Sequence, residues 1–313
     1  MKPLLYLVRA LPGGHFDRLA ARFEVRGGRQ QPAARPELMA EAAEAEVLVT
    51  SYLDRVDEPL LAGLPRLRHL ASYGVGVNHL DLDACRRRGL LVTNTPGVVT
   101  EATAEHAVAL LLACARRVVE GDRVIRRGGW TVPDPAFMLG TGLDGKTLGL
   151  VGFGRIGQAV AKRALGLGMS VIYAGPREVE FPGARRRPLE ALLAESDAVS
   201  LHVPLTPSTE RLLDGARLAL MKPGALLVNT ARGTVVDDAA LAEALRQGRL
   251  AAAGLDVFRD EPRVPAAYLA LENVVLTPHL GSGTRETRSA MAAMVVDEVE
   301  RVASGEPARH AVP

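Results

Sequence analysis

Three side chains capable of acid-base or anion-binding chemistry each follow a predicted strand in the second half of the chain. They are Arg232 in NTARG, Glu261 in GLDVFRDEP and His279 in TPHLGS. Because parallel strands end at one edge of an open α/β sheet, we expect these residues to lie together. A guanidinium can bind a carboxylate and polarise a ketone, and an imidazolium can protonate the alkoxide that hydride transfer produces. A carboxylate on the other imidazole nitrogen would fix the tautomer and favour the protonated ring. Taken singly, each residue also fits a strand end, a turn or a solvated loop, so the prediction depends on their joint occurrence.

A glycine pattern upstream of these residues predicts a dinucleotide site. In TLGLVGFGRIGQAVAKRAL, Gly152, Gly154 and Gly157 match G-x-G-x-x-G directly after an apolar strand and at the start of a helix. The first glycine permits a tight turn, the second lets backbone approach a pyrophosphate, and the third lets helix and strand pack closely. The helix N-terminus adds N–H donors and a positive dipole. The context of the motif therefore favours dinucleotide binding over chance.

The end of the next predicted strand bears on the choice between NADP(H) and NAD(H). An enzyme that uses NAD carries an Asp or Glu there, which bonds the ribose 2′-hydroxyl. Here the strand is followed by Gly175, Pro176 and Arg177. Because Arg177 can meet a 2′-phosphate, the sequence favours NADP(H) over NAD(H). The alternative is that Arg177 is an ordinary exposed residue and that Glu178 supplies the acid.

Short apolar runs alternate with amphipathic stretches along the whole chain, which predicts an α/β protein with parallel sheets. A long helix is expected from Thr100 to about Arg127, and a last helix from Thr284 to about Ser304 should pack on the first domain. We therefore predict a discontinuous substrate-binding domain, 1–98 with 282–313, and a dinucleotide-binding domain at 99–281. Strands are expected at 4–8, 46–50, 67–72 and 90–93 in the first domain, and at 148–152, 170–174, 198–202, 225–229, 252–256 and 273–276 in the second.

Composition excludes several classes of protein. The 313 residues, 48% of them hydrophobic, suffice for two buried cores, and a net charge of +2 does not suggest a nucleic-acid partner. Two cysteines, Cys85 and Cys114, are too few for a disulfide framework or a metal cage, so no metal is expected. The most apolar stretch, 107–115, is shorter than the roughly 20 residues that a membrane span needs. We expect a cytoplasmic protein without a membrane or nucleic-acid partner.

Together these motifs resemble the D-2-hydroxyacid dehydrogenase family over nearly the full length of the chain. GVGVNHLD at Gly74–Asp81 is similar to the family's substrate loop, and NTPGVVTEATAEHAVALLL at Asn94–Leu112 is similar to its hinge and interdomain helix. The resemblance implies an α/β fold of two Rossmann-like domains with parallel sheets, the smaller substrate domain being discontinuous, usually in a homodimer.

The resemblance also implies roles for individual residues. The backbone N–H groups of Val75 and Gly76 would hold the substrate carboxylate, and Thr103 would lie near the nicotinamide. Asp256 would bond the nicotinamide carboxamide. Arg232 would be the substrate-binding arginine, with Glu261 and His279 as the acid-base pair. Cofactor contacts are expected at Thr103, Gly152, Gly154, Arg155, Ile156, Gly157, Gly175, Arg177, Pro204, Thr209, Thr230, Ala231, Asp256, His279 and Gly281.

Within the family the chain is most similar to glyoxylate/hydroxypyruvate reductases. The similarity lies in PHLGSGTRETR, in GGW at Gly128–Trp130, and in Gly175 with Arg177. It implies reduction of a small 2-keto acid to the D-2-hydroxy acid. Alternatives are a broad D-2-hydroxyacid dehydrogenase of the D-lactate type, or a nicotinamide-sensing, corepressor-like binding protein. PAFMLGTGLDGKTLG is similar to phosphonate dehydrogenases, but Val75 stands where those enzymes carry a Lys.

Overall fold

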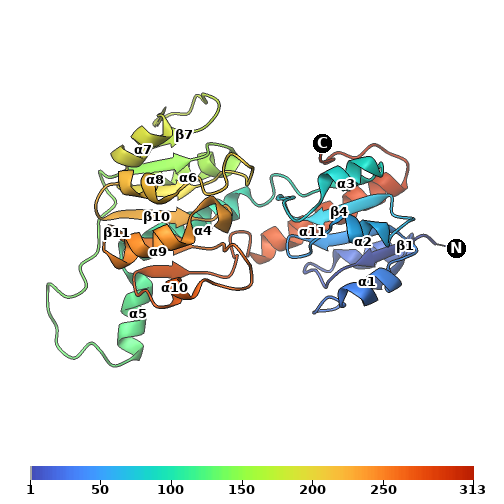
Figure 1. Ribbon diagram of the computed structural model, residues 1–313, viewed down its shortest axis with the longest axis horizontal. Helices are drawn as coiled ribbons and strands as arrows, with labels where there is room; N and C mark the ends of the chain where they lie inside the picture. Colours follow the sequence, from blue (N-terminus) through green and yellow to red (C-terminus); the bar gives the residue numbers. More distant parts are fainter. Residues whose placement is uncertain (1) are drawn as a thin grey trace. The chain divides into compact units, whose positions relative to one another are not determined.

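The computed structural model describes residues 2–313, which group into two compact units. Unit 1 comprises residues 2–99 and Gly283–Pro313, and unit 2 is Thr100–Ser282. The sequence placed these divisions at 98/99 and 281/282. Figure 1 shows both units, each built around one sheet.

Unit 1 contains a five-stranded parallel sheet in the order β2-β1-β3-β4-β5. This 2-1-3-4-5 order is that of flavodoxin-like sheets. The sequence predicted four of these strands and missed β2, because EVRG is an edge strand with little burial. The strands are β1 Leu4–Leu7, β2 Glu24–Gly27, β3 Ala45–Ser51, β4 His69–Tyr73 and β5 Leu91–Thr93.

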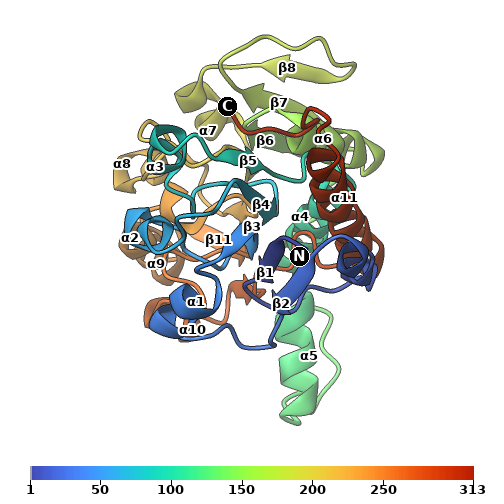
Figure 2. The ribbon, with the colours of Figure 1, turned by 90° about the vertical axis from the view of Figure 1, so that its right-hand side faces the viewer.

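Helices cover both faces of this sheet, as Figure 2 shows. Buried side chains of α1, α2 and α3 form one core cluster with the sheet, and those of η1 and α11 form the other. Helix α11 packs on η1 and β4, the place that the sequence predicts for the last helix. Thr284 caps it, since its Oγ1 accepts from Thr287 N at 3.1 Å. The bounds are η1 His15–Ala21, α1 Arg35–Glu41, α2 Glu58–Ala62, α3 Leu82–Arg87 and α11 Arg285–Ala303.

Unit 2 contains a seven-stranded parallel sheet in the order β12-β11-β10-β9-β6-β7-β8. The order reverses between β6 and β9, which is the switch point of a doubly wound dinucleotide fold. The sequence predicted six of the strands. It missed β8, a three-residue edge strand whose sequence, ARR, lacks an apolar run. The strands are β6 Thr147–Val151, β7 Ser170–Ala174, β8 Ala184–Arg186, β9 Ala198–Leu201, β10 Ala225–Asn229, β11 Leu250–Leu255 and β12 Val274–Leu276.

The helices of unit 2 also form two layers. Helices α4 and α6 pack on one face of the sheet, and α7 to α10 pack on the other. None of the helices within residues 2–313 combines the length and the apolar character that a membrane span requires. The bounds are α4 Thr100–Ala115, α5 Val118–Arg126, α6 Arg155–Gly166, α7 Leu189–Glu195, α8 Gly215–Leu220, η2 Gly233–Val235, α9 Asp238–Arg246 and α10 Ala266–Leu269.

The prediction of one helix from Thr100 to Arg127 is wrong. Arg117 has a φ of 53°, which ends α4 and turns the chain into α5, a helix without buried residues. The returning chain explains the break, because Thr141 N donates to Ala115 O at 2.7 Å and so caps α4. A Cβ on Gly140 would lie 2.5 Å from the same oxygen. Both ribbon views show α5 projecting from the body of unit 2 (Figures 1 and 2).

Candidate active site

The glycine loop between β6 and α6 has the shape that a bound pyrophosphate needs. Gly152 has a φ of 95°, and a Cβ there would lie 2.4 Å from His202 O. A Cβ on Gly157 would lie 2.3 Å from Gly152 O, so these two glycines permit close packing of strand and helix. A Cβ on Gly154 would meet nothing within 4 Å, so this position opens onto free space. The loop therefore fits the phosphates of a dinucleotide, with Arg155 and Ile156 in the first turn of α6.

His279 and Glu261 form a direct pair in unit 2. His279 Nδ1 lies 2.7 Å from Glu261 Oε2, and both side chains are about four-fifths buried, with exposures of 22% and 20%. The other oxygen of Glu261, Oε1, accepts from Phe258 N at 3.0 Å. The carboxylate is therefore held on both oxygens, and it orients the imidazole through Nδ1.

The backbone at His279 is strained. Its φ of 55° is in the left-handed region, which non-glycine residues rarely adopt. The surrounding bonds maintain it, because His279 N donates to Asp256 O at 2.9 Å and to Thr277 O at 3.1 Å. Strain of this kind is concentrated at functional sites, where the neighbouring structure enforces it.

The buried carboxylate of Asp256 holds the loop that contains His279 through hydrogen bonds. It is only 1% exposed; its Oδ1 accepts from Leu280 N at 2.7 Å and Thr277 Oγ1 at 2.6 Å, and its Oδ2 accepts from Gly281 N at 2.8 Å. Burial opposes ionisation of this carboxyl, but hydrogen bonds from His106, Thr277 and Leu280 outweigh it and hold its pKa below the usual value. Because both oxygens bind protein groups, the structure uses Asp256 to hold residues 277–281. Its predicted bond to the carboxamide stays a prediction.

Arg232 lies in the loop that follows β10. The backbone of this loop packs against the backbone of the loop after β11, which contains Glu261. Asn229, at the end of β10, shapes it: Nδ2 donates to Arg232 O at 2.9 Å, and Oδ1 accepts from Ala231 N at 3.0 Å. A Cβ on Gly233 would lie 2.1 Å from Phe258 C, so glycine is required for this approach. The structure thus brings the loops after β10 and β11 into contact and places the half-buried Arg232 beside that contact.

Helix α4 contributes two further side chains beside the His279 loop. Thr103 is 7% exposed, and its Cγ2 would lie 3.4 Å from a Cβ placed on Gly281. His106 Nε2 lies 3.0 Å from Thr277 Oγ1 and 3.2 Å from Asp256 Oδ1. The sequence predicted Thr103 but missed His106. The signal was available, because residues three apart share one face of a helix.

Val75 and Gly76 belong to unit 1, where they follow β4. Asn94 Nδ2 donates to Val75 O at 2.8 Å, and Thr95 N donates to Gly74 O at 3.1 Å. Residues 94–95 therefore hold the start of this loop in place. The loop lies at the carboxyl end of β4, the edge at which parallel α/β sheets bind ligands.

The remaining predicted cofactor residues follow β9, β10 and β7. Thr209 Oγ1 donates to Pro204 O at 2.6 Å in the loop after β9. Thr230 follows β10, and its hydroxyl is buried without a hydrogen-bond partner among residues 2–313, as expected where a ligand completes the site.

Gly175 follows β7 and lines a pocket of about 610 Å³, whereas the exposed Arg177 does not line it. Arg186 and Arg187 do line it, and the sequence analysis missed both.

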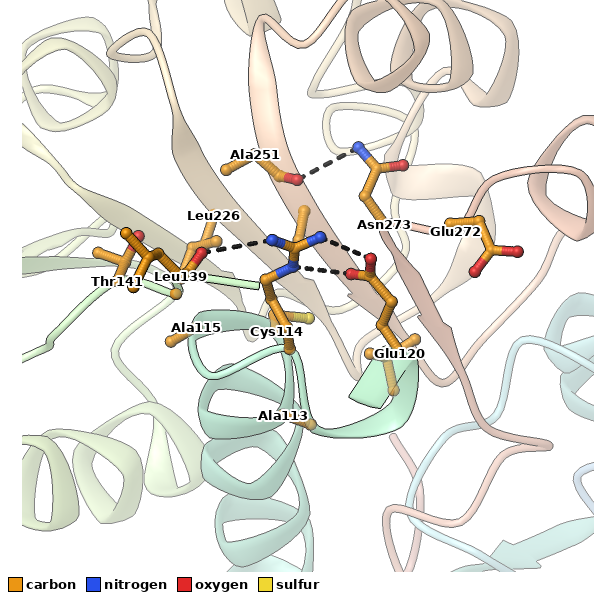
Figure 3. Close-up of a pocket in the computed structure, with 14 residues that line it drawn as sticks. Ala113, Cys114, Ala115, Glu120, Leu139, Thr141, Leu226, Ala251, Glu272 and Asn273 are labelled. Carbon is orange, nitrogen blue, oxygen red and sulfur yellow. Dashed lines mark hydrogen bonds and ion pairs between the residues drawn. The ribbon is translucent and has the colours of Figure 1, made fainter. Parts of the chain in front are cut away.

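A separate pocket of about 360 Å³, shown in Figure 3, contains none of the predicted site residues. It lies between the end of α4, the start of α5 and the amino ends of β11 and β12. Its polar groups bond one another: Arg117 Nη2 lies 2.5 Å from Glu120 Oε1, and Asn273 Nδ2 donates to Ala251 O at 3.2 Å (Figure 3). It is therefore not part of the site at the carboxyl ends of the strands. No cluster of three or more potential metal ligands occurs in the described residues, 2–313.

The doubly wound fold of unit 2, with Arg232 and the Glu261–His279 pair in the loops that follow β10, β11 and β12, is the arrangement that the sequence predicted for a dehydrogenase. Comparison with known proteins makes the assignment specific. The profile of the D-isomer specific 2-hydroxyacid dehydrogenase, NAD binding domain, matches residues 108–281. The chain belongs to the D-isomer specific 2-hydroxyacid dehydrogenase family.

Relatives and solved structures are similar to this chain over nearly its full length. A glyoxylate reductase of Thermococcus litoralis is 46% identical, covering 98% of this chain and 95% of the relative. The crystal structure of a Thermus thermophilus protein matches with a TM-score of 0.94 at 48% identity, covering 99% of each chain. An NADPH-dependent glyoxylate/hydroxypyruvate reductase of Sinorhizobium meliloti, solved with NADP and malonate, matches with a TM-score of 0.90 at 35% identity, covering 100% of this chain and 97% of the other.

Proposed function

We propose that this protein reduces glyoxylate or hydroxypyruvate to glycolate or D-glycerate. The observation that carries the proposal is the Glu261–His279 pair, joined at 2.7 Å in a loop of strained backbone, in the same unit as a dinucleotide-binding glycine loop. The names of the relatives support the choice of substrate. In this proposal unit 2 binds the dinucleotide and unit 1 supplies the substrate loop.

The residues divide the reaction between them. The nicotinamide cofactor supplies the hydride when bound. Arg232 binds the substrate carboxylate and polarises the keto oxygen, and the N–H groups of Val75 and Gly76 hold the same carboxylate. Because Nδ1 of His279 faces Glu261, the proton passes from Nε2 to the oxygen that becomes the hydroxyl. Glu261 fixes the orientation of the ring through Nδ1.

A panel of 2-keto acids tests this proposal. Cofactor oxidation is followed at steady state with glyoxylate, hydroxypyruvate, pyruvate and a branched 2-keto acid, using NADPH and NADH in turn. We expect the highest kcat/KM with glyoxylate or hydroxypyruvate. A branched keto acid as the best substrate would contradict it.

We propose that the physiological cofactor is NADP(H). Support comes from the pocket after β7, which is lined by two arginines and lacks the acidic residue that an NAD site carries directly after the strand. The expected result in the same panel is a higher kcat/KM with NADPH than with NADH. The reverse order would reject this part of the proposal alone.

We propose that the chain forms a homodimer through α5 and residues 127–142. This segment exposes large apolar side chains, including Trp130 at 56% and Leu139 at 69%, and a monomer rarely leaves such a patch uncovered. Helix α5 and residues 130–138 also line an open apolar hollow, which a second copy can fill. Light scattering after gel filtration should give a dimer for the wild type and a monomer for Trp130→Ser combined with Phe137→Ser. Leu269→Ser, at a position on α10 that is 65% exposed, is the matched control.

A cytoplasmic location completes the proposal. Both cysteines are free and buried, which suits a reducing compartment. Fractionation of cells that produce the protein tests this, and recovery with the membrane or secreted fraction would contradict it.

A further inference from the structure

The pocket after β7 has a definite place in the dinucleotide fold. Strand β7 pairs with β6, whose carboxyl end carries the glycine loop. In doubly wound sheets the ribose next to that loop lies at the end of the following strand. The pocket of about 610 Å³ beside Gly175 therefore lies where a bound dinucleotide would place its adenosine ribose and any group on the 2′ oxygen.

The charged groups that line the pocket differ in how far they are neutralised. Arg187 Nε lies 3.1 Å from Glu195 Oε2, so an acid already balances its charge. Arg186 bonds only backbone: Nε and Nη2 donate to Gly175 O at 3.2 and 2.9 Å, and Nη2 lies 3.4 Å from Pro176 O. Glu178, an exposed acid, lines the same pocket.

These contacts fix the Arg186 guanidinium without cancelling its charge. Carbonyl oxygens orient its plane against the turn at Gly175 and Pro176, and Nη1 makes no hydrogen bond to any of residues 2–313. A guanidinium that still has unused N–H donors can donate hydrogen bonds to a phosphate. Arg177, which the sequence suggested for this task, does not line the pocket.

We propose that Arg186 is the residue that selects the 2′-phosphate of NADP(H), and that Glu178 opposes it by favouring the unphosphorylated ribose. This inference rests on the proposed use of NADP(H). Selectivity then depends on the balance between one unneutralised cation and one acid at the rim of the same pocket, and not on the residue that directly follows the strand.

Direct binding of adenosine nucleotides tests the inference without the reaction. Calorimetry measures the affinity of the full-length protein for adenosine 2′,5′-bisphosphate and for 5′-AMP. The wild type should prefer the bisphosphate, and Arg186→Gln should lose about 10- to 100-fold of that affinity while 5′-AMP binding is unchanged. Glu178→Gln should strengthen bisphosphate binding. Arg185→Gln, an exposed neighbour on β8 that does not line the pocket, is the matched control.

Other outcomes of the binding experiment would contradict the role proposed for Arg186. If Arg186→Gln weakens both nucleotides equally, Arg186 only shapes the Gly175 turn and the inference is wrong. Arg186→Lys keeps the charge and should retain part of the preference, which separates loss of charge from loss of folding. A wild type that prefers 5′-AMP also overturns the inference. Failure to reduce glyoxylate, with the bisphosphate preference intact and dependent on Arg186, would reject the proposed reaction and leave the inference standing.

Discussion

The carboxyl edge of the unit 2 sheet is built in two different ways. After β11 and β12, Asp256 is 1% exposed, and it holds Leu280 and Gly281 through its carboxylate. In the pocket after β7, the exposed Arg186 at the end of β8 donates hydrogen bonds to backbone carbonyls alone. A site for proton transfer needs fixed geometry, which the hydrogen bonds of Asp256, Glu261 and His279 would provide. Recognition of an added phosphate needs mainly a well-placed charge, which an exposed and exchangeable side chain can supply.

Loss of the imidazole should have the largest effect on activity. We expect His279→Gln to lower kcat for glyoxylate reduction by about 10²- to 10⁴-fold, because the substitution removes the proposed proton donor. Glu261→Gln keeps the ring and should cost less. Steady-state rates decide this, with calorimetry of adenosine 2′,5′-bisphosphate as the binding control. An unchanged kcat would show that the proton comes from another group.

Two glycine variants separate packing from ligand approach in the loop after β6. Gly157→Ala should destabilise the fold by about 1–3 kcal/mol, because its Cβ would meet backbone. Gly154→Ala opens onto free space, so it should retain stability but weaken dinucleotide binding. Urea unfolding and nucleotide calorimetry distinguish them. Equal destabilisation by both would contradict the packing analysis.

The Asp256 network should be visible in the pH dependence of stability. Because its folded pKa lies below the unfolded value, ionised Asp256 stabilises the protein above the ordinary Asp value of 3.8. That contribution is lost as the pH falls through the folded pKa. The free energy of unfolding of Asp256→Asn should therefore fall less than that of the wild type on acidification. Parallel curves from urea titrations below neutrality would refute this.

The smallest effect is expected at Arg177. Since this residue does not line the pocket after β7, Arg177→Gln should change the KM for NADPH by less than about 2-fold. Arg186→Gln, measured beside it, should change it far more. A larger effect at Arg177 than at Arg186 would reverse the comparison and assign cofactor selectivity to Arg177, as the sequence suggested.

Local signals explain which elements were predictable. Strands such as Leu148 to Val151 are continuous apolar runs because both faces of the sheet are covered, and the glycine loop depends on neighbours in sequence. Strands β2 and β8 escaped detection because short, polar edge strands lack that signal. The break at Arg117 was equally hidden, since it depends on a chain that returns to cap α4 from residue 141.

The amino-acid sequence by itself determined the α/β class, the dinucleotide loop and the order of Arg232, Glu261 and His279, because each follows from short-range periodicity or from a motif at a strand end. Only the tertiary structure decided that Asp256 and His106 hold the His279 loop, and that Arg186 and not Arg177 lines the pocket after β7. These contacts join strands and helices far apart in the chain. Their geometry depends on how the sheet is assembled, which short-range patterns do not encode.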